Sequence, residues 1–325
     1  MRASKGVIYI GGTGRCGTNA LKDLFSSASN AAALPFETRF TIDPDGVSSL
    51  YREMLTNNIY GYHKTQKRFS KLMRRMSKRT LLDVVAIYVE SFLKKYGFNQ
   101  TLRAYSGWEL SMHFPGFEYE VDRLLSNLRS VDFQASWPGE GACSASSMSI
   151  PVSAQEELAS LFSSFLDNLY SEYLASECAE YYVDDNTFNL LHADTLSEIT
   201  NNATFVHSIR DPRNVVLSMQ KQRWCPSKLE EAICFYKYLM KGILEKESRL
   251  SQDRLYRVKV EEIFKNPSCI IRIFSDLGLD LAGVDVNALL KSSSSSNSND
   301  WSSASGDVKR VLNRELKQYV ELFQY

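Results

Sequence analysis

The sequence has no apolar run of 18 residues or more, so no membrane-spanning helix is expected. It enters a strand-like run at residue 7 without the apolar core of a signal peptide. These absences predict a cytoplasmic protein, although a trimmed secretory-pathway enzyme would have the same features. Acidic and basic residues number 38 each, and the net charge of +0 argues against a nucleic-acid-binding protein. Any basic binding surface must therefore be local.

Cysteine is also scarce, and its spacing is irregular. The six cysteines include no Cys-x-x-Cys pair, which argues against a zinc ribbon. In a chain of 325 residues we expect buried free thiols rather than a disulfide framework. Serine is abundant in one segment, 291–306, which lacks apolar periodicity and is predicted to be a flexible loop.

Short apolar runs alternate with helical patterns through much of the chain. The runs typical of buried parallel strands lie at 7–10, 181–183, 204–209 and 255–260. The helical patterns lie at 18–27, 212–222, 228–248, 267–277 and 307–323. A further strand or turn is expected near 33–37. This order predicts an α/β fold with a doubly wound, mostly parallel sheet.

The middle of the chain interrupts this alternation. Residues 47–178 are predicted to form a largely helical insertion within a single domain that spans residues 1–325. Helices are expected over 47–100, a less regular stretch over 105–152, and an amphipathic helix over 153–178. The helical pattern at 64–79 is strongly basic.

A glycine-rich segment, Gly11-Gly12-Thr13-Gly14-Arg15-Cys16-Gly17-Thr18-Asn19, joins the first strand to the first helix. Small residues let backbone N–H groups converge on an anion in front of a helix N-terminus. Gly12 and Gly17 have the spacing of a Walker A loop, but Thr18 and Asn19 replace its Lys-Ser/Thr pair. The missing lysine argues against ATP or GTP hydrolysis, whereas Arg15 can contact one phosphate. A glycine turn without a ligand and a Rossmann dinucleotide loop are the alternatives.

A second candidate phosphate contact follows the strand at 204–209. Arg210 ends this strand, Pro212 begins the next helix, and Ser218 lies two turns into that helix. Open α/β sheets place ligands at the carboxyl edge of their strands. Arg210 and Ser218 can therefore clamp one more phosphate.

Together these motifs resemble the sulfotransferases that depend on PAPS (3′-phosphoadenosine 5′-phosphosulfate), which share the fold of P-loop NTPases. Residues 14–19 are similar to the 5′-phosphosulfate loop of that family, and residues 209–218 look very like its 3′-phosphate motif, including the Arg-to-Ser spacing. Residues 255–279 resemble the late strand–helix segment. The motifs are closest to those of protein-tyrosine and heparan-type enzymes and their microbial relatives, and the resemblance covers roughly 1–45 and 180–280.

The resemblance implies that a sulfuryl group is transferred from PAPS to a hydroxyl or amine, without a metal. The acceptor would be a glycan, a peptide or a small hydroxyl compound, held by residues 47–178. The implied donor contacts are Gly14, Arg15, Cys16, Gly17, Thr18, Asn19, Arg210 and Ser218. Glu37, within a Glu-Thr-Arg triplet that protein-tyrosine sulfotransferases also carry, is implied as the general base, with pairing to Arg39 or a turn cap as the alternative. Arg15 would also stabilise the leaving group.

Some positions depart from the family pattern. Cys16 and Asn19 replace the usual serine and threonine, and Asp184 and Asp185 lie where many relatives carry a lysine. Asp185 either serves the acceptor or is structural. A P-loop nucleotide or small-molecule kinase, with a magnesium ion on one of these aspartates, is one alternative. A non-catalytic adenosine-bisphosphate-binding protein is another. The basic segment 64–79 either guides an acidic acceptor or forms a solvated helix face.

Overall fold

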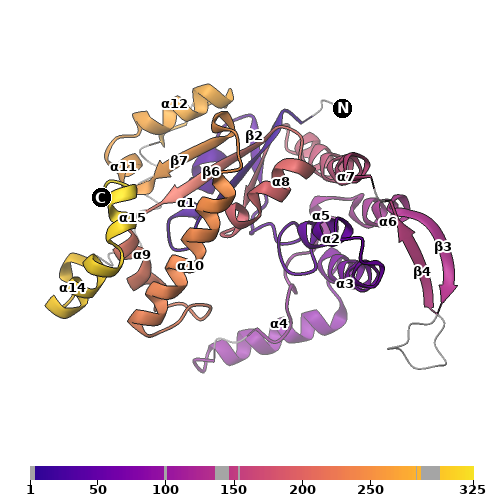
Figure 1. Cartoon of the computed structure of the whole chain (residues 1–325), viewed down its shortest axis with the longest axis horizontal. Coiled ribbons are helices and arrows are strands. Elements are labelled where there is room, and N and C mark those ends of the chain that lie inside the picture. The colour runs from indigo at the N-terminus through magenta and orange to yellow at the C-terminus, as the bar shows by residue number, and fades with distance from the viewer. Residues whose placement is uncertain (1–3, 99–100, 136–145, 153, 283, 287–300) are drawn as a thin grey trace. The chain divides into compact units, whose positions relative to one another are not determined.

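The computed structural model describes residues 4–98, 101–135, 146–152, 154–282, 284–286 and 301–325 (Figure 1). Within it the chain divides into two compact units. The first comprises Thr38–Ser176 and Glu198–Asn201, and the second comprises Ser4–Glu37, Glu177–Ser197 and Asn202–Tyr325. The predicted insertion at 47–178 thus falls almost wholly in the first unit, and the single-domain organisation stays a prediction.

The second unit is built on a five-stranded sheet in the order β2-β5-β1-β6-β7, in which all neighbouring strands are parallel. The strands are β1 (Gly6–Gly11), β2 (Ala31–Ala33), β5 (Tyr181–Asp185), β6 (Ala203–Ile209) and β7 (Leu255–Lys259). The prediction of a mostly parallel sheet is confirmed. Strand β2 overlaps the predicted 33–37 only at Ala33 and ends there, and Pro35 has no N–H with which to continue a ladder.

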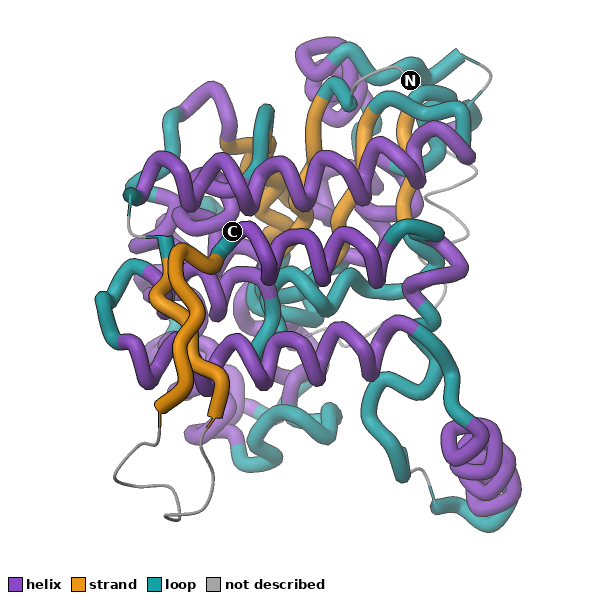
Figure 2. The backbone as a smooth tube through the Cα atoms, turned by 90° about the vertical axis from the view of Figure 1, so that its right-hand side faces the viewer, coloured by secondary structure: helices purple, strands orange, loops and turns teal. Residues whose placement is uncertain are grey.

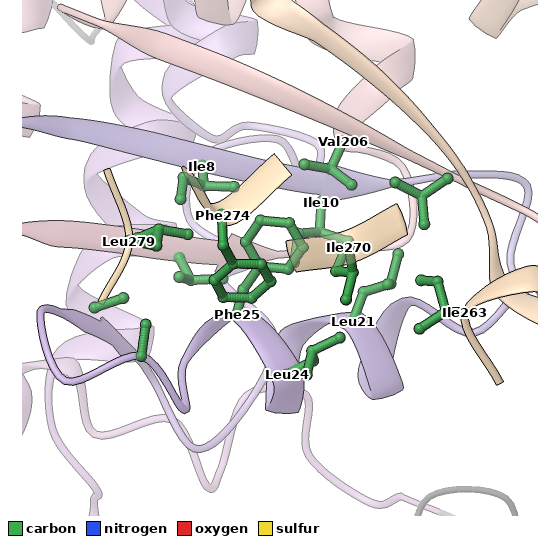
Figure 3. Packing of buried hydrophobic residues seen from close by; sticks show 14 of the residues in the cluster. Ile8, Ile10, Leu21, Leu24, Phe25, Val206, Ile263, Ile270, Phe274 and Leu279 are labelled. Atoms are coloured by element: carbon green, nitrogen blue, oxygen red, sulfur yellow. The ribbon is translucent and has the colours of Figure 1, made fainter. Parts of the chain in front are cut away.

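One face of this sheet packs against α1 (Thr18–Phe25), α11 (Val260–Lys265) and α12 (Ser268–Leu277). Figure 3 shows Ile8 and Ile10 of β1 over the side chains of Leu21, Phe25 and Phe274. The rings of Phe25 and Phe274 lie 4.8 Å apart, centroid to centroid. Helix α12 ends, as predicted, at a left-handed glycine, residue 278.

Side chains alternate between the faces of a strand, so the residues beside Ile8 and Ile10 point the other way. There Tyr9 stacks on Phe205, and the ring of His207 meets Phe323 beyond α15. The Nδ1 atom of His207 also lies 2.6 Å from the buried carboxylate of Glu247, in α10. The helices packed together on this side are α9 (Pro212–Met219), α10 (Leu229–Glu247), α14 (Gly306–Glu315) and α15 (Lys317–Leu322). Helices therefore cover both faces, which confirms the doubly wound arrangement.

The remaining pieces of the second unit are short. They are α8 (Ala193–Ile199), which leads into the first unit, and the 3₁₀ turns Asn189–His192, Gln252–Arg254 and Trp301–Ser303. The helix predicted at 307–323 is divided at Leu316 into α14 and α15. Of the serine-rich loop predicted at 291–306, residues 291–300 lie outside the described residues.

The first unit is mainly helical, as predicted. Its helices are α2 (Val47–Met54), α3 (Ile59–Ser77), α4 (Leu81–Lys94), α5 (Leu110–His113), α6 (Phe117–Asn127) and α7 (Gln155–Ser176). The sequence did not predict the antiparallel ribbon of β3 (Arg129–Ala135) and β4 (Ser146–Pro151), which Figure 2 shows in orange. Aromatic side chains fill the core of this unit, where Phe40 meets Phe114 and Phe117 edge to face. Within the described ranges, no helix has both the length and the apolarity needed to cross a membrane.

The five cysteines that fall within the described ranges are free thiols, as predicted. Cys16 is buried and Cys225 is half-buried. The remaining three, Cys178, Cys234 and Cys269, are exposed, so the prediction that they are buried is wrong. Cys178 follows the end of α7, Cys269 lies at the start of α12, and Cys234 lies on the exposed face of α10. Cys143 lies outside the described residues.

Candidate functional site

The glycine-rich loop turns sharply between β1 and α1. Gly14, Arg15 and Gly17 all have left-handed backbone conformations, with φ of 82°, 58° and 94°. Glycine adopts this region at little cost, whereas a residue with a side chain does so uncommonly, and such residues gather at ligand sites. Gly17 is the N-cap of α1 and provides no side-chain cap. The N–H groups at the start of α1 therefore point out of the helix toward the loop.

Close packing explains why the loop needs its glycines. A Cβ atom on Gly14 would lie 2.5 Å from Cη2 of Trp224, and one on Gly12 would lie 2.5 Å from Sγ of Cys16. A Cβ on Gly17 would meet Val260 at 3.0 Å. At Gly12 and Gly14 the added atom would force its neighbour or the loop to shift, so the present packing of the loop depends on these glycines.

The structure brings the two predicted phosphate motifs together. Nε of Arg15 donates a hydrogen bond to Oγ of Ser218 over 3.0 Å, and Nη1 of Arg210 donates to the carbonyl oxygen of Arg15 over 3.3 Å. Oγ of Ser208 donates to the carbonyl oxygen of Cys16 over 2.7 Å. Two guanidinium groups therefore lie beside the loop, where the carboxyl ends of β1 and β6 meet.

A second layer of contacts fixes the start of α9. Asp211 caps this helix by accepting from the backbone N–H of Arg213, and its carboxylate also binds the Arg213 guanidinium. The backbone N–H of Asp211 donates to Oε1 of Glu261 over 3.0 Å, and Nε of Arg210 lies 3.7 Å from the same oxygen. The hydroxyl of Tyr325 donates to Oε2 of Glu261 over 2.6 Å. The Glu261 carboxylate thus holds the backbone of Asp211 and the guanidinium of Arg210 in place.

Sequence reasoning did not single out Glu261 or Tyr325. Glu261 lies in the late segment that carries the family resemblance, but nothing in its spacing indicated a contact with Arg210. Tyr325 is 64 positions away from Glu261 and has no local signal.

Two carboxylates lie near the loop. Oγ1 of Thr187 approaches Oε1 of Glu37 at 3.5 Å, and Asp185, at the end of β5, is 2% exposed. Neither Asp185 carboxylate oxygen has a close hydrogen-bond partner among the described residues. Burial and, to a lesser extent, the negative charge of Glu37 raise the pKa of Asp185 to about 7, against an opposing effect of Lys22. Nearby Arg39, the predicted alternative partner of Glu37, lies 3.5 Å from the Asp43 carboxylate.

The remaining predicted loop contacts differ in exposure. Cys16 is buried, and its burial raises the pKa of the thiol, so it packs as a neutral side chain and not as a nucleophile. Thr18 is also buried, while Asn19 is exposed in the first turn of α1. If position 16 contacts an anion, as predicted, the burial of the Cys16 side chain leaves its backbone for that contact.

Comparisons with known proteins bear on the fold and the family. Among solved structures, the sulfotransferase domain of the Synechococcus PCC 7002 olefin synthase is similar over 100% of this chain and 96% of that chain, with a TM-score of 0.50 and 14% identity. A Mycobacterium avium sulfotransferase matches with a TM-score of 0.45 and 12% identity, over 99% of this chain and 77% of that chain. At such identities the first similarity indicates a shared fold, the P-loop-like α/β fold.

No curated protein sequence matches this chain. The family described as "Sulfotransferase family", however, matches residues 118–282, slightly more than half of the chain. The matched range contains Arg210 and Ser218, while the loop at 11–19 and Glu37 precede it. The chain therefore belongs to the sulfotransferase family.

Proposed function

We propose that this sulfotransferase uses PAPS as its donor and transfers the sulfuryl group to a hydroxyl or amine of the acceptor. The observation that carries the proposal is the hydrogen bond from Arg15 to Ser218. It joins the 5′-phosphosulfate loop to the 3′-phosphate motif, and PAPS carries one anionic group for each. A nucleoside triphosphate lacks the 3′-phosphate and would leave Arg210 and Ser218 without a ligand.

The loop residues fit the 5′ end of such a donor. The backbone N–H groups of Gly17, Thr18 and Asn19 lie at the start of α1, where a helix favours negative charge. The Arg15 guanidinium uses Nε for Ser218, which leaves its other N–H groups for a phosphate oxygen. These groups would neutralise the charge that grows on the 5′-phosphate as its bond to sulfur breaks.

Glu37 is proposed as the general base. As the acceptor oxygen forms its bond to sulfur, the bond from sulfur to the 5′-phosphate breaks, and adenosine 3′,5′-bisphosphate leaves. The proton of the acceptor passes to the Glu37 carboxylate. The hydroxyl of Thr187, 3.5 Å from Oε1 of Glu37, supports this carboxylate from the side of β5. No step in this sequence calls for a metal ion.

Asp185 is proposed to hold a proton beside Glu37. Its pKa of about 7 means that the neutral form is populated at neutral pH. A neutral Asp185 repels Glu37 less than a second carboxylate would, and its carboxyl proton is available for a hydrogen bond to the acceptor. This proposal assigns Asp185 to the acceptor rather than to structure alone.

Calorimetry tests the donor assignment. Adenosine 3′,5′-bisphosphate should bind, and ATP and ADP should bind at least tenfold more weakly, because they lack the 3′-phosphate. Labelled PAPS would then be offered with acceptors of each class, and transfer of label would identify the productive class. Magnesium-dependent ATP turnover without bisphosphate binding would favour the kinase alternative. Bisphosphate binding without transfer to any acceptor would favour a binding protein.

A further inference from the structure

Helix α3 in the first unit has two chemically distinct faces. Tyr62, Phe69, Met73 and Met76 are buried against the rest of the unit. The opposite face is exposed and basic; its cations are Lys64, Lys67, Arg68, Lys71 and Arg74, and the exposed Lys78 directly follows the last residue of the helix. Residues three and four positions apart lie on one side of a helix. These cations therefore form a continuous stripe along α3, which is about 28 Å long at the usual rise per residue.

Acidic residues neutralise only part of this stripe. Arg68 pairs with Asp45 at 2.8 Å, and Lys78 pairs with Glu118 at 2.9 Å. Arg74 lies 3.6 Å from Asp122, a pair in which both side chains are largely exposed and so weakly coupled.

Three lysines of the stripe, Lys64, Lys67 and Lys71, have no ion-pair partner among the residues that the structure describes. They follow one another at spacings of three and four residues. The stripe therefore carries a net positive charge even though the whole chain is neutral.

The stripe borders an open groove of about 720 Å³. Arg68, Lys71, Arg74 and Arg75 line it from α3, and Arg103 and Tyr105 line it from the segment after α4. A separate, smaller hollow of about 290 Å³ along α3 is lined by Lys67 and Arg129. Four of the six stripe cations, Lys67, Arg68, Lys71 and Arg74, thus line concave surfaces.

A buried carboxylate orders two of the groove cations. Arg75 and Arg103 both bind Asp83, whose side chain is inaccessible to solvent. Thr80 also donates to Asp83 through its backbone N–H and its hydroxyl, and these contacts with the two arginines hold the pKa of Asp83 well below its usual range. One negative charge therefore positions two guanidinium groups and leaves the groove positive.

The groove is also lined by an aromatic ring, that of Tyr105, and by the carboxylate of Asp45. Tyr105 has a left-handed backbone, with φ of 61°, its ring packs edge to face on Trp108, and its hydroxyl donates to Asp43. A rigid ring of this kind offers an apolar surface to one face of a sugar. The carboxylate of Asp45, which also lines the groove, can accept hydrogen bonds from sugar hydroxyls.

We propose that this groove binds an acidic polysaccharide, whose carboxylate or sulfate groups pair with the stripe while a sugar ring packs on Tyr105. Paired guanidinium groups suit planar or tetrahedral oxyanions, and several cations in a row suit a ligand with a repeating charge. This assignment rests on the proposed function, for which it names the acceptor class. An acidic peptide is the rival, but the described residues that line the groove belong to no strand and are mostly charged, so they offer such a peptide neither a strand edge nor a row of apolar pockets.

Binding of a heparin octasaccharide to the full chain, without donor, tests the proposal at about 0.15 M salt. The double variant Lys67→Glu/Lys71→Glu should lose roughly tenfold in affinity, because two attractive contacts become repulsive. A matched control is Lys241→Glu/Lys265→Glu, which makes the same charge change at exposed lysines of the second unit. This control should bind like the wild type.

Three outcomes would overturn the proposal: equal losses in the two double variants, no heparin binding, or tighter binding of a polyglutamate peptide or single-stranded DNA of equal charge. If the charge reversals unfold the chain, Lys67→Gln/Lys71→Gln removes the same charges more gently and should weaken binding severalfold. Affinity for adenosine 3′,5′-bisphosphate is measured in parallel. If the chain binds the bisphosphate but not heparin, the proposal for the groove is refuted and the proposed donor stands. If it binds heparin but not the bisphosphate, the proposed donor is refuted and the groove stands.

Discussion

Replacing Asp185 with asparagine should stabilise the protein at alkaline pH and leave it nearly unchanged in acid. The ordinary pKa of the aspartate carboxyl is 3.8, whereas burial and the Glu37 charge raise the pKa of Asp185 to about 7 in the folded protein. Between these values the folded state holds a proton that the unfolded state has lost. Stability therefore falls as pH rises through this window, and the full cost is present above pH 7.

The size of the effect follows from the same two values. A gap of about 3 pH units corresponds to about 4 kcal/mol, which is an upper bound because water can reach the opened site. Asparagine has nearly the same shape and no charge to bury. Asp185→Asn should therefore gain up to about 4 kcal/mol in unfolding free energy relative to wild type above pH 8, and little at pH 4.

Urea denaturation of both proteins across this pH range measures the difference directly. Glu37→Gln should reduce the difference, since it removes one cause of the raised pKa of Asp185. Asp253→Asn, at an exposed position, is the control and should change nothing. If the wild type and Asp185→Asn keep a constant separation at every pH, Asp185 does not titrate as argued, and its proposed role as a proton holder fails.

Three further substitutions test the site. Glu37→Gln should lower turnover about a hundredfold or more while adenosine 3′,5′-bisphosphate still binds in calorimetry; unchanged turnover would exclude the base role. Ser218→Ala removes the acceptor of the Arg15 hydrogen bond and should weaken bisphosphate binding about tenfold while the weaker ADP binding stays the same, and equal losses for both ligands would argue against a 3′-phosphate contact. Gly14→Ala places a Cβ against Trp224 at a left-handed backbone, so thermal unfolding should show a loss of about 1–3 kcal/mol, and a wild-type melting profile would contradict the packing described for the loop.

The sheet could be predicted because its central strands are continuous apolar runs that turn signals bound. Strand β1 and its neighbours β5 and β6 are buried on both faces, so their sequences carry a strong signal. The ribbon of β3 and β4 could not be predicted, since β3 is largely exposed and its pairing with β4 depends on backbone hydrogen bonds that composition does not reveal.

The candidate site likewise has a part that the sequence predicts and a part that it does not. Both candidate phosphate motifs could be picked out from the sequence, because each depends on a short local spacing, and their role in binding stays a prediction. The hydrogen bond from Arg15 to Ser218 was not, because it joins residues 203 positions apart and exists only once β1 and β6 lie side by side. The groove along α3 needed the structure for a similar reason: Arg103, which lines it, is 20 positions from Asp83, and their contact has no local sequence signal.

The bond between Arg15 and Ser218 has a thermodynamic consequence under the proposed function. The Arg15 guanidinium takes part in both halves of the donor site. The conformational entropy lost when this side chain is fixed is therefore a single cost that serves the contacts with two phosphates. A ligand that carries only one phosphate must order the same side chain for half of the contacts. The site would then discriminate by the separation between two anionic groups on one molecule, and the contributions of those groups to affinity would be cooperative rather than additive.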